Sequence, residues 1–258
     1  MSSDTVTEVG KEETDVHTRM LRIGLAEADS RVYWRQAHRQ IPQKDLKRVA
    51  FEERWFGSRT QARVRYLINN LTYRFDAFPG ALETLERWNP TDLADRTLVC
   101  HWHVQLSDPL YREFTSAVFD LRRQHPEPTI DRTTAVRWVD TKTRSRWSSS
   151  TTQRMATGML ACAADAGLCE PTKAIRKLTF PKVSDHALGY LLYLLKDLNY
   201  EGSLKNNPYA LSVGLDGEFW SQKVRQLPWL SYRRMADVHD LKWEFKNLTE
   251  WGKEVFAQ

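Results

Sequence analysis

The chain has 258 residues, of which 41% are hydrophobic and 11% aromatic, a composition typical of a folded globular protein and not of a disordered one. Its 38 lysines and arginines outnumber its 33 aspartates and glutamates, for a net charge of +5. No apolar run approaches the ~20 residues that a membrane helix requires. The polar start does not resemble a signal peptide, and three cysteines without metal-ligand spacing suit a reducing compartment. We therefore expect a cytoplasmic protein without a membrane span, a disulfide or a structural metal.

The acidic residues are unevenly distributed along the chain. Residues 1–16 hold five acids and one base, and they are predicted to form a disordered acidic tail. The remaining residues therefore carry 37 basic and 28 acidic side chains, or +9. A surplus of this size permits an interaction with a polyanion. Only clustering of the basic residues can distinguish a binding site from a surface with an ordinary excess of positive charge.

Residues 17–125 are predicted to form an N-terminal helical half. Apolar residues recur at helical spacing from 18 to 39, and again after Ser58, which we expect to cap a helix that continues to Phe75. Further helices are predicted over 81–88 and 92–104, and Pro109 is suited to open the next. Two prolines within 125–128 indicate a loop, which we take as the boundary between two halves.

Residues 129–200 are predicted to form a C-terminal helical half with a possible wing. A short helix over 133–139, a basic connector over 142–147 and a serine-capped helix over 151–166 precede a small β element near 174–180. Ser184 is expected to cap an apolar helix. Residues 201–258 form an extension that contains Trp, Gly and Pro. The fold class is therefore mainly α, with two helical halves that are NusB-like or winged-helix-like.

Two basic clusters are the candidate binding sites. Seven bases against three acids lie within 44–65, and six bases against one acid within 132–154. Each cluster adjoins a predicted helix start, where backbone N–H groups, the helix dipole and arginine side chains suit a phosphate. The alternative is that these arginines only solvate the faces of amphipathic helices. The candidate DNA-binding residues are Arg59, Arg63, Arg65, Lys142, Arg144, Arg146, Ser149 and Arg154.

Other constellations give little support for catalysis, and we expect no catalytic residue, cofactor or metal. His101 and His103 would point about 200° apart on a helix, so they are interpreted as packed or surface histidines. No nucleotide-binding or nucleophile motif occurs. A metal-dependent nuclease would have to assemble acids that are scattered in the sequence: Asp165, Asp185, Asp216, Glu218, Asp237 and Asp240.

Several segments resemble the BrxA component of bacteriophage exclusion (BREX) defence systems. The resemblance spans about residues 20–170, and the later part of the chain, about 171–258, departs from the family. The segments that carry it are Gly24-Leu-Ala-Glu-Ala-Asp-Ser30, Gly57-Ser-Arg-Thr-Gln-Ala-Arg-Val-Arg-Tyr-Leu67, Leu98-Val-Cys-His-Trp102 followed by Phe114, and Trp147-Ser-Ser-Ser-Thr-Thr-Gln-Arg154 leading to Ala166-Gly-Leu168.

This resemblance implies an all-helical protein, similar in shape to the antitermination factor NusB, that binds double-stranded DNA without known catalysis. Residue by residue, the resemblance to the family assigns a role only to the basic positions Arg59, Arg63, Arg65 and Arg154. We therefore expect a non-catalytic DNA-binding component of a phage-defence complex, with other defence proteins as partners. A protein–protein adaptor that scaffolds a methyltransferase or an ATPase is the first alternative, and a nuclease is the second.

Overall fold

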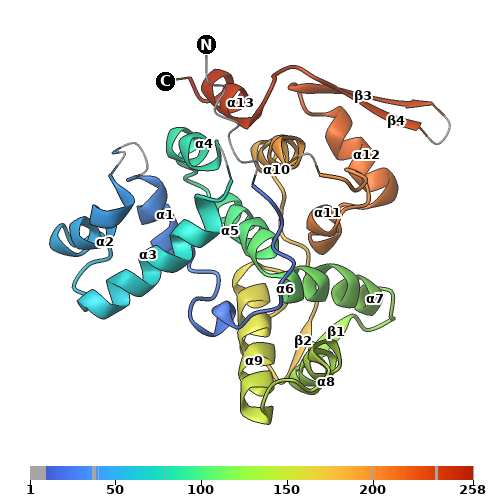
Figure 1. The fold of residues 1–258 in the computed structure, drawn as a ribbon. Coiled ribbons are helices and arrows are strands. Elements are labelled where there is room, and N and C mark those ends of the chain that lie inside the picture. Colours follow the sequence, from blue (N-terminus) through green and yellow to red (C-terminus); the bar gives the residue numbers. More distant parts are fainter. Residues whose placement is uncertain are drawn as a thin grey trace.

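The computed structural model describes residues 10–36, 39, 41–78, 80–198, 200–235 and 238–257, and helices dominate the fold (Figure 1). The elements are η1 (Arg19–Leu21), α1 (Glu27–Trp34), α2 (Gln43–Glu52), α3 (Gln61–Phe75), α4 (Ala81–Trp88), α5 (Leu93–Ser107), α6 (Pro109–Glu113), η3 (Phe114–Val118), α7 (Phe119–Arg123), β1 (Thr129–Asp131), α8 (Arg132–Thr143), α9 (Ser149–Asp165), β2 (Ile175–Lys177), α10 (Asp185–Asp197), α11 (Pro208–Ser212), α12 (Gly217–Arg225), β3 (Leu230–Met235), β4 (Val238–Trp243) and α13 (Leu248–Val255). The predicted mainly α class with a small β element is confirmed.

Helix α5 forms the centre of the molecule. Asp92 caps its start by accepting a hydrogen bond from the Ala94 N–H, and every residue from 98 to 107 is buried. The helix packs against α1 and α3 on one side and against α9 and α10 on others (Figure 1). One hydrophobic cluster runs from Met20 to Trp251, so both predicted halves share a single core.

The helix expected over 18–39 is interrupted. Among the described residues up to 36, the helical elements are α1 and the short turn η1, and the two are separated where Ala26 adopts a left-handed conformation with φ 52°. The buried Arg74 guanidinium donates hydrogen bonds to the carbonyls of Gly24 (3.1 Å) and Leu25 (3.0 Å), which helix bonds would otherwise use. Helical spacing of apolar residues therefore gave the wrong structure here, since a tertiary contact captures the backbone carbonyls.

The expectation of a disordered tail is wrong for residues 10–16, while residues 1–9 lie outside the described part. The Glu13 backbone N–H donates to the Leu106 carbonyl at 2.9 Å, and the Arg112 guanidinium donates to the Glu13 carbonyl at 2.9 Å. The Glu13 side chain accepts a hydrogen bond from the Tyr73 hydroxyl. Glu13 is thus held against α3, α5 and α6.

Helices α8 and α9 pack against each other across a short connector, between strands β1 and β2. The helix predicted over 133–139 extends over Arg132–Thr143, and the serine-capped helix begins at Ser149. Strands β1 and β2 pair antiparallel, with Ile130 opposite Arg176. The loop at 125–128 is thus followed by a strand that the sequence pattern did not reveal.

The C-terminal extension is part of the same body. Helix α13 returns to pack on α4 and α10, and the buried Trp251 stacks on Tyr193 with ring centroids 5.6 Å apart. Strands β3 and β4 form an antiparallel hairpin that projects beyond α12 (Figure 1). No helix in the described ranges is long and apolar enough to cross a membrane.

Candidate nucleic-acid interface

The start of α9 is a capped, exposed helix terminus. The Ser148 hydroxyl accepts a hydrogen bond from the Thr151 N–H at 3.3 Å, which fixes the first turn. Ser149 and Ser150 are exposed, and the first N–H groups of a helix have no intrahelical acceptor. Ser149 is therefore at a position where backbone donors and the helix dipole both favour an anion.

A groove of about 630 Å³ lies between α8 and α9, beside this terminus. Arg132 and Arg137 reach it from α8, and the Arg132 guanidinium donates to the Gln153 side chain at 3.2 Å. Asp140 also lines the groove, and its carboxylate accepts a hydrogen bond from the Ser145 hydroxyl at 3.2 Å. The charged groups that line the groove are therefore two arginines and one carboxylate.

The predicted residues of this cluster lie near the start of α9, and they differ in how far other residues engage their side chains. Arg144 and Arg154 are exposed, and neither forms a hydrogen bond or ion pair through its side chain with any described residue. Arg146 donates through Nε to the Thr143 carbonyl at 3.1 Å, and Lys142 pairs with Glu113. Among the predicted site residues of this cluster, Arg144 and Arg154 are thus the two most available cations.

The first cluster is built differently from the expectation. Thr60, not Ser58, caps α3, and its hydroxyl accepts from the Arg63 N–H at 3.3 Å. Ser58 stands too early, because the chain turns through Gly57 at φ 75° and becomes helical only at residue 61. Arg59 pairs with Asp29 at 2.8 Å, so part of its charge is neutralised within the fold.

The side chains of Arg63 and Arg65 on α3 have different surroundings. The Arg63 side chain donates to the Arg22 carbonyl at 3.4 Å. Arg65 is exposed and lines a groove of about 450 Å³ between α2 and α3, together with Lys44 and Lys47 of α2. The two lysines were not among the predicted site residues, although the spacing of three residues places them on one helix face.

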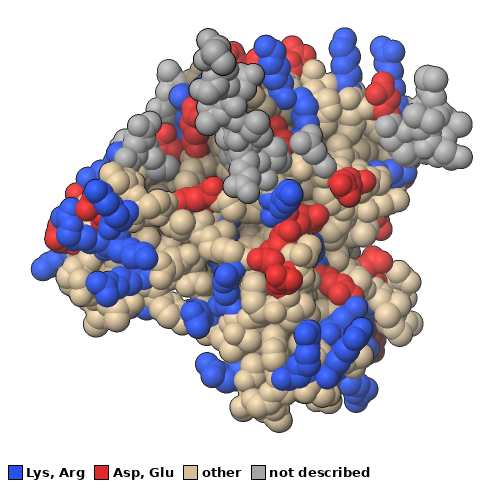
Figure 2. Space-filling model, in the orientation of Figure 1, with Lys and Arg blue, Asp and Glu red and all other residues tan. Residues whose placement is uncertain are grey.

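Basic side chains gather in two places on the face shown in Figure 2. One gathering covers α2 and the start of α3, and the other covers α8 near the start of α9. Acidic side chains concentrate between α6 and α10, directly above the basic gathering over α8. Both predicted clusters are thus accessible from the same side of the molecule.

The paired histidines of α5 are core residues. His103 Nδ1 lies 3.0 Å from the Arg74 carbonyl and must donate to it, so Nε2 accepts from the Tyr190 hydroxyl at 2.7 Å. His101 is held by the hydroxyls of Tyr111 (3.0 Å) and Ser212 (2.9 Å). Burial lowers the pKa of each imidazole to about 3. Both are therefore neutral, with all four ring nitrogens engaged.

The acids considered for a nuclease do not converge in the described residues, where no group of three or more His, Cys, Asp or Glu side chains could hold a metal ion. Asp185 instead pairs with Lys223 at 3.6 Å. Asp237 lies outside the described ranges.

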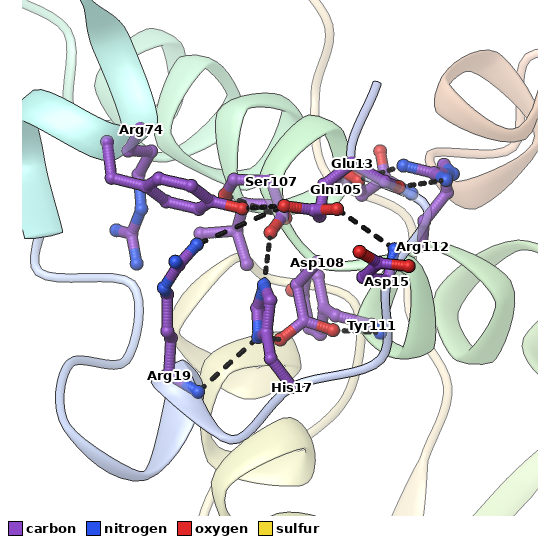
Figure 3. Close-up of polar contacts among 12 residues, drawn as sticks. Glu13, Asp15, His17, Arg19, Arg74, Gln105, Ser107, Asp108, Tyr111 and Arg112 are labelled. Carbon is purple, nitrogen blue, oxygen red and sulfur yellow. Dashed lines mark hydrogen bonds and ion pairs between the residues drawn. The ribbon is translucent and has the colours of Figure 1, made fainter. Parts of the chain in front are cut away.

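A polar cluster at the N-terminal segment closes over the buried Asp108 (Figure 3). His17 Nε2 donates to the Ser107 carbonyl at 2.9 Å, and its Nδ1 lies 3.8 Å from Asp108 Oδ2. Burial raises the pKa of the Asp108 carboxyl. The adjoining cavity measures only about 20 Å³, so the cluster fastens residues 10–18 and offers no room for a substrate.

Known proteins resemble this chain at two levels. A crystal structure of an uncharacterized protein from Magnetospirillum magneticum has a TM-score of 0.60, with 13% sequence identity over 78% of this chain and 98% of that one. At that identity the likeness concerns the fold alone. No curated protein matches the chain. The family model of BrxA matches residues 17–190, while the α11–α13 extension lies beyond it. The chain therefore belongs to the BrxA family and is a component of a BREX anti-phage defence system.

Proposed function

We propose that the protein binds double-stranded DNA without catalysing a reaction, within a cytoplasmic complex of BREX defence proteins. The observation that carries this proposal is the start of α9. Exposed serine N–H groups, the helix dipole and the unpaired Arg144 and Arg154 meet there beside the groove between α8 and α9. Such an arrangement suits backbone phosphates, which position a protein on DNA without reading sequence.

The elements around α9 support the same function. Two helices joined by a short connector, with α8 packed on α9 and a strand on either side, have the order of a winged helix-turn-helix. In that motif the second helix enters the major groove. The exposed face near the start of α9 carries Ser149, Gln153 and Arg154, whose polar groups suit DNA. The helix-turn-helix likeness is part of the proposal.

Simultaneous charge reversal of Arg144, Arg146 and Arg154 to Glu tests this function. We expect duplex binding to be lost or greatly weakened, with similar losses on unrelated sequences, because phosphates carry no sequence information. Conservative neutralisation to Gln should lower the slope of log affinity against log salt by about 0.9 for each lost phosphate contact. The melting temperature should barely change, since exposed substitutions cost less than about 0.5 kcal/mol each.

The matched control reverses three exposed lysines outside both clusters, Lys173, Lys242 and Lys246, and changes the net charge equally. Equal losses in the two triple variants would mean that net charge, not the α9 surface, drives the association. Binding by the α9 variant at the parental level would reject this surface as a DNA site.

One observation favours the adaptor as a second function. Phe180 and Phe219 are 60% and 53% exposed and flank an apolar groove of about 510 Å³ between the β2–α10 connection and α12. Exposed aromatic surface of this kind is typical of protein contacts. Loss of a defence-protein contact on Phe219→Asp, with DNA binding unchanged, would assign this function to the groove.

A further inference from the structure

The groove between α2 and α3 has an unusual lining. All six of its residues are polar, four are cationic and none is acidic. Those residues are Lys44, Lys47, Arg48, Gln61, Arg65 and Asn69. Arg48 is paired with Asp45 (3.3 Å) and Glu52 (2.7 Å) of its own helix, outside the lining. The side chains of the other three cations make no hydrogen bond or ion pair with any residue in the described ranges.

The chemistry of this lining selects a polyanion with many acceptors. Cations and the amide side chains of Gln61 and Asn69 all supply donors. Gln61 is also the first residue of α3, so its N–H is one of the helix-terminal donors that have no intrahelical acceptor. Three unpaired cations of one sign that surround a groove raise the local concentration of a phosphate-rich partner.

The basic gathering over α2 and the start of α3 lies on the same face as the basic gathering over α8 (Figure 2). The turn η1 packs against α9 and passes between the two basic regions (Figure 1). It brings Arg19 and Arg22, both exposed, to the flank between them, and Arg63 of α3 donates to the Arg22 carbonyl. Arg22 therefore adds an exposed cation on this flank, while Arg19 is ion-paired with Glu13 at 4.0 Å.

We infer that the α2–α3 groove is a second DNA-backbone site, and that one duplex bridges it and the α9 terminus. The inference rests on the proposed function. Duplex DNA stays straight over such lengths, because its persistence length is about 150 bp. A chain of this length has a radius of gyration of roughly 18 Å, so a duplex of about 15 bp, or roughly 50 Å, spans the molecule. We expect an 8 bp duplex, which is roughly half as long, to reach one site only.

The test replaces Lys44, Lys47 and Arg65 by Gln and measures binding to duplexes of 8 bp and 20 bp as a function of salt. The parent should bind the longer duplex far more tightly than added length alone explains, because the second contact becomes intramolecular. The triple variant should lose at least tenfold in affinity for the 20 bp duplex. The slope of its log affinity against log salt should fall by about two to three units, because each of three lost phosphate contacts contributes about 0.9.

Neutralising Lys173, Lys242 and Lys246 to Gln provides the charge-matched control, and it should keep the parental length dependence. A groove variant that binds the 20 bp duplex like this control overturns the second site, while the α9 function stands. A parent that binds neither duplex overturns both proposals. Circular dichroism verifies that the variants are folded, which their exposed positions lead us to expect.

Discussion

Individual residues of the core show how a polar side chain can be structural. Arg74 is buried among α3, α5 and α9, and burial lowers the pKa of its guanidinium. Its guanidinium donates hydrogen bonds to the carbonyls of Gly24 and Leu25. A buried arginine therefore holds the start of the segment 24–30, which resembles the BrxA family. The basic residues of this chain thus include buried ones that hold core segments by hydrogen bonds and exposed ones that carry surface charge, and burial distinguishes the two groups.

His101 and His103 predict how stability depends on pH. Both are neutral in the fold with pKa values of about 3, whereas an unfolded histidine titrates near 6.5. Below pH 6.5 the unfolded chain binds protons that the folded chain excludes, so the free energy of unfolding falls as pH falls. The loss is on the order of 2 kcal/mol for each histidine by pH 5.

Urea unfolding at pH 7.5 and pH 5.5 measures this dependence. His103→Gln preserves a donor for the Arg74 carbonyl and an acceptor for the Tyr190 hydroxyl but cannot titrate. We expect it to remove about half of the loss. A carboxyl whose pKa is raised by burial, such as Asp108, opposes the trend, so the variant and the parent are compared at the same two pH values. An unchanged pH dependence in the variant would show that other groups control it.

At the scale of elements, local signals succeeded wherever a cap and an apolar stripe coincide. Ser184 and Ser148 both cap the helices expected from them, through hydrogen bonds to Ala187 (3.0 Å) and Thr151 (3.3 Å). The prediction failed at residue 58, where a threonine two positions later offered a cap in a better place. The sequence did not predict strands β3 and β4, because their apolar and polar residues alternate only weakly and tryptophan occurs in cores and in strands alike.

The cap of α9 can be removed without touching its charges. Ser148→Ala should destabilise the protein by about 1 kcal/mol, because the Thr151 N–H loses its acceptor. Thermal melting measures the effect, with Ser58→Ala as the control, because the exposed Ser58 hydroxyl makes no hydrogen bond with any described residue. Since Arg144 and Arg154 are retained, the salt slope of DNA binding should stay parental. A changed slope would mean that Ser148 itself contacts a phosphate.

At the scale of the whole molecule, the C-terminal extension completes the core. Trp251 is buried against Trp229 and Tyr193, and the Thr84 hydroxyl of α4 donates to the Leu248 carbonyl of α13 at 3.1 Å. Residues beyond the BrxA match thus cover α4, which lies within it, and α10, whose first half lies within it. The family region and the extension therefore share one core.

Trp251→Ala should therefore destabilise the whole protein by about 3–5 kcal/mol, since it opens a large cavity in the shared core. Chemical denaturation followed by circular dichroism should show one transition at lower denaturant for both regions. Trp243→Ala, at a half-buried position in β4, should cost less. Two separate transitions, with the α1–α9 region unaffected, would show that the extension is an independent domain.

The sequence by itself determined the helical class, most helix positions, the caps at Ser148 and Ser184, the β element at 175–177 and the two basic clusters. These depend on local spacing and capping chemistry. Only the tertiary structure decided which cations are available. Arg59 and Lys142 have acidic partners from distant segments, whereas Lys44 and Lys47 join Arg65 across two helices. Ion pairing and groove formation depend on contacts between segments that no local pattern encodes.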